Sequence, residues 1–164
     1  MTIRIAATIF LITCLLSLDA KAQSPQRSAD LILSFEVQGI NARMAPEQAR
    51  QVLLDAGFTE IRGDDWGKVP TAQFSKDNVT VAISHFEGTI HGLTEFHAFT
   101  GELFDYSDIL ARIRAHFDIA ADDPACVERD YGTRCGFGDG EPKGARFIAS
   151  LTTQQISIQY GKRR

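Results

Sequence analysis

Residues 71–101 read TAQFSKDNVTVAISHFEGTIHGLTEFHAFTG, and this stretch decides the expected fold. Apolar and polar residues alternate in it with the period of two that is typical of a half-buried β-strand. Turn residues interrupt the alternation at Lys76-Asp77-Asn78 and at Glu87-Gly88, and Gly101 ends it. The stretch therefore predicts three strands, near 71–75, 79–86 and 90–100.

A helix is expected immediately before these strands. Pro46 suits the first helical turn, and Gly57 suits the left-handed residue that ends a helix, with Phe58 folding back over the last turn. Between them, apolar residues recur at the spacing i, i+3, i+4 and i+7, which makes one apolar stripe. These residues are Ala49, Val52, Leu53 and Ala56. Further upstream, Leu33, Phe35 and Val37 alternate with polar residues and predict another strand.

The second half of the chain repeats this order. Asp105 is placed to cap a helix, with Asp108 at its third position. The apolar stripe of this helix consists of Ile109, Leu110, Ile113 and Phe117. Three strands are expected afterwards, near 126–131, 145–151 and 155–160. The glycine-rich segment 136–144 between the first two is expected to be a mobile loop.

The expected fold class is therefore α+β, with two pseudo-repeated modules of one helix and three strands each. Their helices are expected to pack on an antiparallel sheet, because each apolar stripe and each apolar sheet face must be buried. The predicted boundaries are 31–104 for the first module and 105–161 for the second, and a basic tail follows at 162–164. The resemblance between the modules is one of pattern rather than of residue identity.

The N-terminus predicts export. Arg4 gives a positive start, an apolar run follows to Leu18, and the small-x-small sequence Ala20-Lys21-Ala22 is typical of a signal-peptidase site. Residues 1–22 are thus interpreted as a cleaved signal peptide, and 23–30 as a flexible lead-in. The apolar run is short for a bilayer span, so no integral membrane span is expected after cleavage. The expected location is periplasmic or secreted.

The charge balance excludes two classes of partner. The 164 residues carry 17 basic and 21 acidic side chains, a net charge of −4. Nucleic acids and anionic membrane surfaces are bound by basic faces, so neither is expected as a main partner.

Two cysteines remain once the leader is removed. Cys126 and Cys135 lie on either side of Asp130-Tyr131-Gly132, where a tight turn is expected. In an oxidising compartment, such a pair most simply forms a disulfide, which here staples a hairpin.

No catalytic group is predicted. The sequence lacks a G-x-S-x-G motif, and its carboxylates cluster in loops rather than facing each other across an expected cleft. His85 and His91 flank the Glu87-Gly88 turn, and His97 follows on the same strand. A metal site that also uses Glu87 or Glu95 is one interpretation, and ordinary surface histidines are the other. Surface histidines are the better interpretation, and no cofactor or metal is expected.

Four side chains that are expected to be exposed are the candidate binding residues. They are Trp66, His85, His91 and Phe99. Trp66 is the single tryptophan and lies in a charged turn. Phe96 and Phe99 differ in strand parity, so a regular strand points them to opposite faces of the sheet. One of these two phenylalanines is therefore either exposed for docking or covered by other elements.

Two family resemblances add to this interpretation. Residues 37–58 resemble the helix-opening pattern of modules in the SmpA/OmlA outer-membrane lipoproteins and the beta-lactamase inhibitor proteins: Met44 and Gly57 match. Arg43 stands in place of the glycine, and Ala45 replaces the capping hydroxyl, a loss of about 1 kcal/mol of helix stability. Residues 95–103 are similar to the strand end of PepSY domains, without their aspartate. These resemblances imply exported proteins without cofactors that bind proteins or peptides.

The predicted function is an exported, small, non-enzymatic module of the cell envelope that binds or inhibits another protein or peptide. The alternatives are a metal-dependent hydrolase that uses the strand histidines and a structural envelope component.

Overall fold

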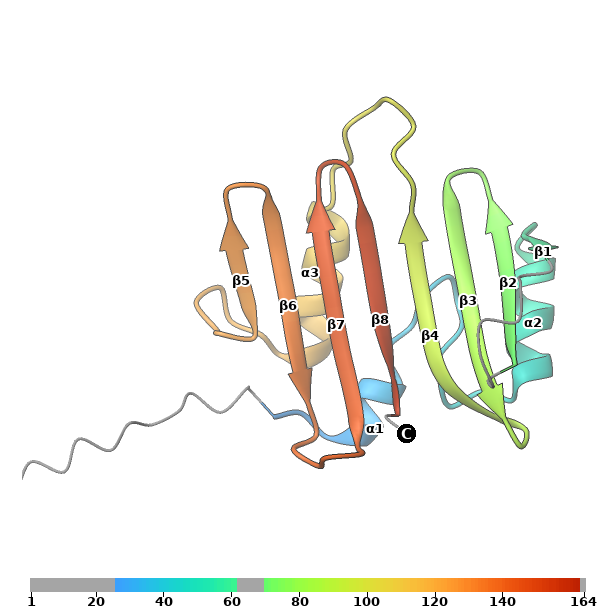
Figure 1. Ribbon diagram of the computed structural model, residues 1–164. Helices are drawn as coiled ribbons and strands as arrows, with labels where there is room; N and C mark the ends of the chain where they lie inside the picture. The colour runs from blue at the N-terminus through green and yellow to red at the C-terminus, as the bar shows by residue number, and fades with distance from the viewer. Residues whose placement is uncertain (1–25, 62–69, 163–164) are drawn as a thin grey trace, which may run out of the picture.

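A computed structural model describes residues 26–61 and 70–162, and these ranges form one eight-stranded antiparallel sheet with short helices (Figure 1). The order of strands across the sheet is β1-β2-β3-β4-β8-β7-β6-β5. The strands are β1 (Thr59–Ile61), β2 (Thr71–Lys76), β3 (Val79–Phe86), β4 (Thr89–His97), β5 (Cys126–Arg129), β6 (Gly132–Gly138), β7 (Ala145–Thr152) and β8 (Ile156–Lys162). The helices are α1 (Ala29–Leu33), α2 (Pro46–Asp55) and α3 (Ser107–Phe117).

The expected α+β fold of two helix-plus-three-strand modules is wrong. The protein is mostly β, and only 20% of the described residues are helical. Each half of the chain contributes four strands instead of three, and all of them join one sheet. The additional strands, β1 and β6, escape the sequence analysis because β1 is very short and β6 is rich in glycine.

The two halves meet where β4 pairs with β8. Glu95 lies opposite Ile158, and Gly92 lies opposite Gly161. The last described strand therefore lies in the middle of the sheet, beside the last strand of the first half (Figure 1). Because this ladder is continuous from Gly92 to His97, the halves share one backbone hydrogen-bond network rather than a side-chain interface.

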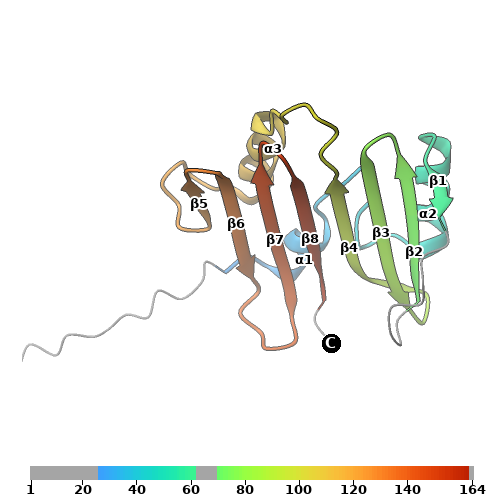
Figure 2. The same ribbon diagram turned by 45° about the horizontal axis from the view of Figure 1, so that its top comes forward.

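The described helices lie on one side of the sheet, as the two views show together (Figures 1 and 2). On this covered side, strand residues alternate with the period of two and are buried, as in Ala145, Phe147, Ala149 and Leu151 of β7. The residues between them, Arg146, Ile148 and Ser150, face the other side. The core therefore occupies a single layer between the sheet and the helices.

An aromatic cluster fills this core beneath the second half of the sheet. Its members are Phe35, Phe117, Phe137, Phe147 and Tyr160, with ring centroids between 4.5 and 6.1 Å apart. The hydroxyl of Tyr160 donates a buried hydrogen bond to the carbonyl oxygen of Phe35. The segment after α1 is thereby fixed to the central strand β8.

The predicted helix before the first strands is confirmed as α2. Pro46 opens it, Gly57 follows its end with φ +85°, and the amide of Phe58 donates to the carbonyl of Leu53. Its N-cap residue, Ala45, makes no side-chain capping hydrogen bond. The predicted helix near 105–117 is also present, as α3, but its N-cap residue is Tyr106 rather than the predicted Asp105, which accepts a hydrogen bond from the amide of Ser107.

The strand predicted at Leu33, Phe35 and Val37 is wrong. Leu33 ends α1, and Val37 begins a tight turn that brings its backbone against Ile40. Phe35 and Val37 are buried, but one follows a helix end and the other precedes a turn. Their alternation thus arises from two different local structures that face the same core.

The glycine-rich segment 136–144 was expected to be a mobile loop, and this is wrong for three of its nine residues. Residues 136–138 belong to β6, and only residues 139–144 form a loop. The carboxylate of Asp139 organises this loop, because it accepts hydrogen bonds from the amides of Glu141 and Ala145. The predicted signal peptide, residues 1–22, lies outside the described residues.

Candidate functional site

The face of the sheet opposite the helices is the candidate functional site. Within residues 26–61 and 70–162, no helix lies on this open face (Figure 2). One row of cross-strand neighbours runs over it through Arg134, Ser150, Ser157, Phe96 and Thr80. The next row runs through Gly136, Ile148, Gln159, Thr94 and Ala82. Short side chains dominate both rows, so the surface of the open face lies close to the sheet backbone except at a few larger residues.

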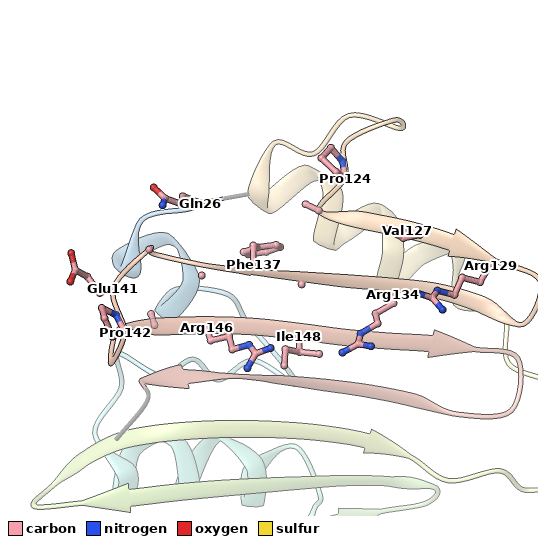
Figure 3. Close-up of a pocket in the computed structure, with 15 residues that line it drawn as sticks. Gln26, Pro124, Val127, Arg129, Arg134, Phe137, Glu141, Pro142, Arg146 and Ile148 are labelled. Atoms are coloured by element: carbon pink, nitrogen blue, oxygen red, sulfur yellow. The ribbon is translucent and has the colours of Figure 1, made fainter. Parts of the chain in front are cut away.

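The open face is hollowed over the second half of the sheet. One hollow has a volume of about 590 Å³ and lies over β6 and β7, where Gly136 and Gly138 have no side chains (Figure 3). A hollow of about 290 Å³ adjoins it at the seam of β4 and β8, and one of about 200 Å³ lies beside Tyr131. Ile148 lines all three, so they form one connected depression.

Three arginines edge this depression. Arg129, Arg134 and Arg146 come from β5, β6 and β7, and each lines two of the three hollows. Figure 3 shows Arg134, Arg146 and Ile148 side by side on one face of the sheet, with Glu141 away from them in the loop. We call the depression lined by Arg129, Arg134, Arg146 and Ile148 the arginine hollow.

The guanidinium groups of the arginine hollow form no ion pair within the described residues. Ion pairs hold Arg27, Arg43, Arg50 and Arg114, which bind Asp123, Asp30, Glu60 and Glu128 respectively. In the described ranges, no carboxylate lies within ion-pair distance of Arg129, Arg134 or Arg146. The depression is lined by these three arginines and by Glu141, so it presents an excess of positive charge on a chain whose net charge is −4.

The predicted disulfide is confirmed, and it borders the arginine hollow. Cys126 and Cys135 are bonded and lie opposite each other on β5 and β6. Both are buried on the covered side, so their neighbours Val127 and Arg134 face the open side. The bond holds the edge strand β5, which carries Arg129, against β6.

A buried polar cluster lies on the covered side, at the seam of the two halves. Glu95 is 1% exposed, and its Oε1 atom accepts hydrogen bonds from Gln38 Nε2 at 2.6 Å and from His97 Nε2 at 2.9 Å. Its Oε2 atom has no partner among the described residues. Burial by itself raises the pKa of Glu95, yet the hydrogen bonds and the charges of His97 and Arg112 hold this pKa below the usual 4.5.

The buried carboxylate also acts on its neighbour Tyr160. Burial first, and the charges of Glu95 and Glu36 second, raise the pKa of the Tyr160 phenol, so it stays protonated and can donate to Phe35. The cluster is thus a network that orders the core. Of the residues in this cluster, Tyr160 lines the hollow at the seam of β4 and β8, whereas Glu95, Gln38 and His97 line none of the three hollows.

The structure does not gather the histidines into one site. His85 lies at the end of β3, beside a bulge, and pairs with Ile90. His91 lines the seam hollow and contacts the ring of Phe86, whereas His97 lies on the covered side beside Glu95. In the part of the chain that the structure describes, no three His, Cys, Asp or Glu side chains are grouped to hold a metal ion.

The four candidate binding residues predicted from the sequence are not gathered into one site either. Trp66 lies outside the described residues. Phe99 is 51% exposed in the connection between β4 and α3, where Leu103 is 68% exposed. Of the three candidates within the described residues, only His91 lines one of these hollows of the open face.

Sequence reasoning missed the arginines and Glu95. Arg129 and Arg146 lie in predicted strands, but no strand was expected at 132–135 and residues 136–138 were assigned to a loop, so the strand that places Arg134 between them was missing. The signal for it is that Thr133, Cys135 and Phe137 alternate with small and charged residues. Glu95 has the strand parity of Leu93, a signal that places it on the buried face.

No protein-family model, curated protein or solved structure matches the chain. The resemblances to SmpA/OmlA modules, beta-lactamase inhibitor proteins and PepSY domains therefore stay predictions. No helix in the described ranges has the length and apolar character that a bilayer span needs.

Proposed function

We propose that this chain is an exported, non-enzymatic protein that binds another protein through the open face of its sheet. The observation that carries the proposal is the connected depression on that face, which is edged by arginines without a carboxylate partner in the described fold. Arginine is enriched in protein interfaces, where its planar fork binds carboxylates.

The surroundings of the depression fit a macromolecular partner better than a small molecule. The depression is open and shallow, whereas small-molecule sites bury most of their ligand in a mainly apolar cleft. Short side chains such as Ser150, Ser157 and Thr94 let a partner's surface approach the backbone of the sheet closely. The ordered strands beneath them lose little conformational freedom on binding.

Export is supported by the leader-like sequence of residues 1–22 and by the disulfide between Cys126 and Cys135. Disulfides persist in oxidising compartments and are rare in the cytosol. The alternative of a metal-dependent hydrolase has no support in the described residues, since the histidines are not grouped.

Site-specific photo-cross-linking tests the proposal. A photoreactive phenylalanine is placed at Thr94 or Gln159 on the open face, and at Gln51 of α2 or Ala111 of α3 as matched exposed controls on the helical side. In native extracts of the producing organism, we expect the open-face positions to cross-link one shared protein and the helix positions to give no such product.

Mass spectrometry of the cross-linked product identifies the partner. Equal products from both sides of the molecule would contradict the proposal. A product made of two copies of this chain would also overturn it, since that result assigns the open face to self-association.

A further inference from the structure

We propose that the arginine hollow binds an extended acidic segment of the partner, with two carboxylates that flank one apolar side chain. This inference rests on the proposed function and names the chemistry of the bound surface. It follows from the spacing of Arg134, Ile148 and Arg146 in the sheet register.

The register fixes the spacing along the strands. Arg134 lies opposite Ser150 on β7, and Ser150 is four residues from Arg146 on the same strand. At a rise of about 3.3 Å per residue, this offset is about 13 Å. Ile148 lies midway, and its side chain shares the open face with both arginines.

An extended peptide has the same rise per residue as the strands below it. Acidic residues at positions i and i+4 of such a peptide match Arg134 and Arg146, and an apolar residue at i+2 matches Ile148. Arg129, on the neighbouring edge strand, extends the positive charge beyond Arg134 and donates a hydrogen bond to the hydroxyl of Tyr131.

The chemistry of the three groups selects carboxylates and an apolar side chain together. Each guanidinium offers two parallel N–H donors to a carboxylate, which a lysine cannot do. Between them, Gly136 leaves room above β6, so that Ile148 is reachable from the open side. A free inorganic anion could pair with the guanidinium groups, but it would leave the side chain of Ile148 exposed to water.

The binding test uses the full mature chain and two capped decapeptides. One peptide consists of two Glu-Ser-Val-Ser-Glu units, and the control peptide has Gln in place of every Glu. Binding is followed by isothermal titration and by the NMR signals of the arginine side chains and of Ile148. We expect saturable binding of the Glu peptide with shifts at Arg134, Arg146 and Ile148, and at least tenfold weaker binding of the Gln peptide.

Variants separate this inference from general charge attraction. Arg134→Gln with Arg146→Gln is expected to weaken Glu-peptide binding at least tenfold, while Arg43→Gln, an exposed arginine outside the hollow, leaves it unchanged. The Arg134→Lys, Arg146→Lys variant keeps the charge and is expected to recover only part of the affinity. All these side chains are exposed, and urea denaturation checks that the variants are folded.

Three results would overturn the inference. They are equal binding of the Glu and Gln peptides, unchanged binding by the Arg134→Gln, Arg146→Gln variant, and shifts with inorganic phosphate that match those with the Glu peptide at Arg134, Arg146 and Ile148. If these results occur while Thr94 and Gln159 still cross-link a partner, the acidic segment is wrong and the open-face function stands. If the peptide binds as expected but no partner cross-links, the proposed function fails instead.

Discussion

His97 donates a hydrogen bond to the carboxylate of Glu95 on the covered side of the sheet, with 2.9 Å between Nε2 and Oε1. The carboxylate is almost fully buried, and the imidazole is 13% exposed at the rim of the core. Gln38, from the turn after α1, donates to the same oxygen. The pair therefore connects the central strand β4 to the N-terminal segment through one buried charge.

The Glu95 cluster predicts a loss of stability in acid. Because the folded-state pKa of Glu95 lies below the usual 4.5, the unfolded chain takes up a proton more readily than the folded chain. The ionised carboxylate thus stabilises the fold above about pH 4.5, and this contribution is lost as pH falls through the lower folded-state pKa. Urea denaturation at a series of pH values is expected to show this fall in the free energy of unfolding.

The Glu95→Gln variant is expected to unfold more easily at neutral pH, by about 1–3 kcal/mol, and to have a shallower acid slope. Glu60→Gln is the control, because Glu60 pairs with Arg50 at the surface and not in the core. An acid slope of Glu95→Gln as steep as that of the unmodified chain would contradict the assignment.

The seam between the halves predicts a difference between two paired glycines. Gly161 has φ +153°, and a Cβ there would strike the carbonyl of His91 on β4. Its partner Gly92 has room, since a Cβ would meet Ser84 Cβ at an ordinary 3.8 Å. We expect Gly161→Ala to lower the free energy of unfolding by about 1–3 kcal/mol and Gly92→Ala by about 0.5 kcal/mol or less. Chemical denaturation measures the free energy of unfolding of both variants. Equal effects would argue against the close approach of β8 to the backbone of β4 at Gly161.

The hydroxyl of Tyr160 predicts a third effect on stability. Tyr160→Phe removes the donor to Phe35 and leaves a buried carbonyl unsatisfied, which costs about 1–3 kcal/mol. Tyr131→Phe is the matched control, because Tyr131 is exposed in the β5–β6 turn. Thermal unfolding of the two variants should differ clearly; identical midpoints would show that the buried hydrogen bond is not needed.

The disulfide predicts the stability of the edge strand. It closes a loop with a sequence separation of 9, so its removal is expected to cost about 2–3 kcal/mol. The Cys126→Ala, Cys135→Ala double variant and the reduced native chain should both show this loss in urea denaturation. Non-reducing mass spectrometry of the native chain checks the bond itself, and two free thiols in that material would refute it.

The sequence predicts the local elements best where several signals agree. For α2, the proline at its start, the apolar stripe and the glycine after its end all indicate the same helix, and the structure has it at Pro46–Asp55. The Cys126–Cys135 bond follows from leader-like sequence, even cysteine count and the turn between them. These features depend on residues that are near one another in the chain.

The overall fold and the candidate site could not be predicted in the same way. The pairing of β4 with β8 joins residues far apart in sequence, and no local signal says that two similar halves share one sheet. The glycines of β6 leave space for the arginine hollow on the open face. The same glycines weaken the strand pattern in the sequence, so the strand and the hollow above it could not be predicted. The strand parity of Glu95 indicates burial, but its hydrogen-bond partner Gln38 lies 57 residues away in the chain, so the buried cluster could not be predicted.

The central position of β8 has a consequence for how the chain acquires its structure. β4 has no neighbour on one edge until residues 156–162 are available, so the first half cannot complete its sheet during synthesis of the polypeptide. The edge of β4 that pairs with β8 therefore stays open until the last described strand has been made. Truncation before Gln155 should accordingly leave an open edge that pairs with other chains and aggregates.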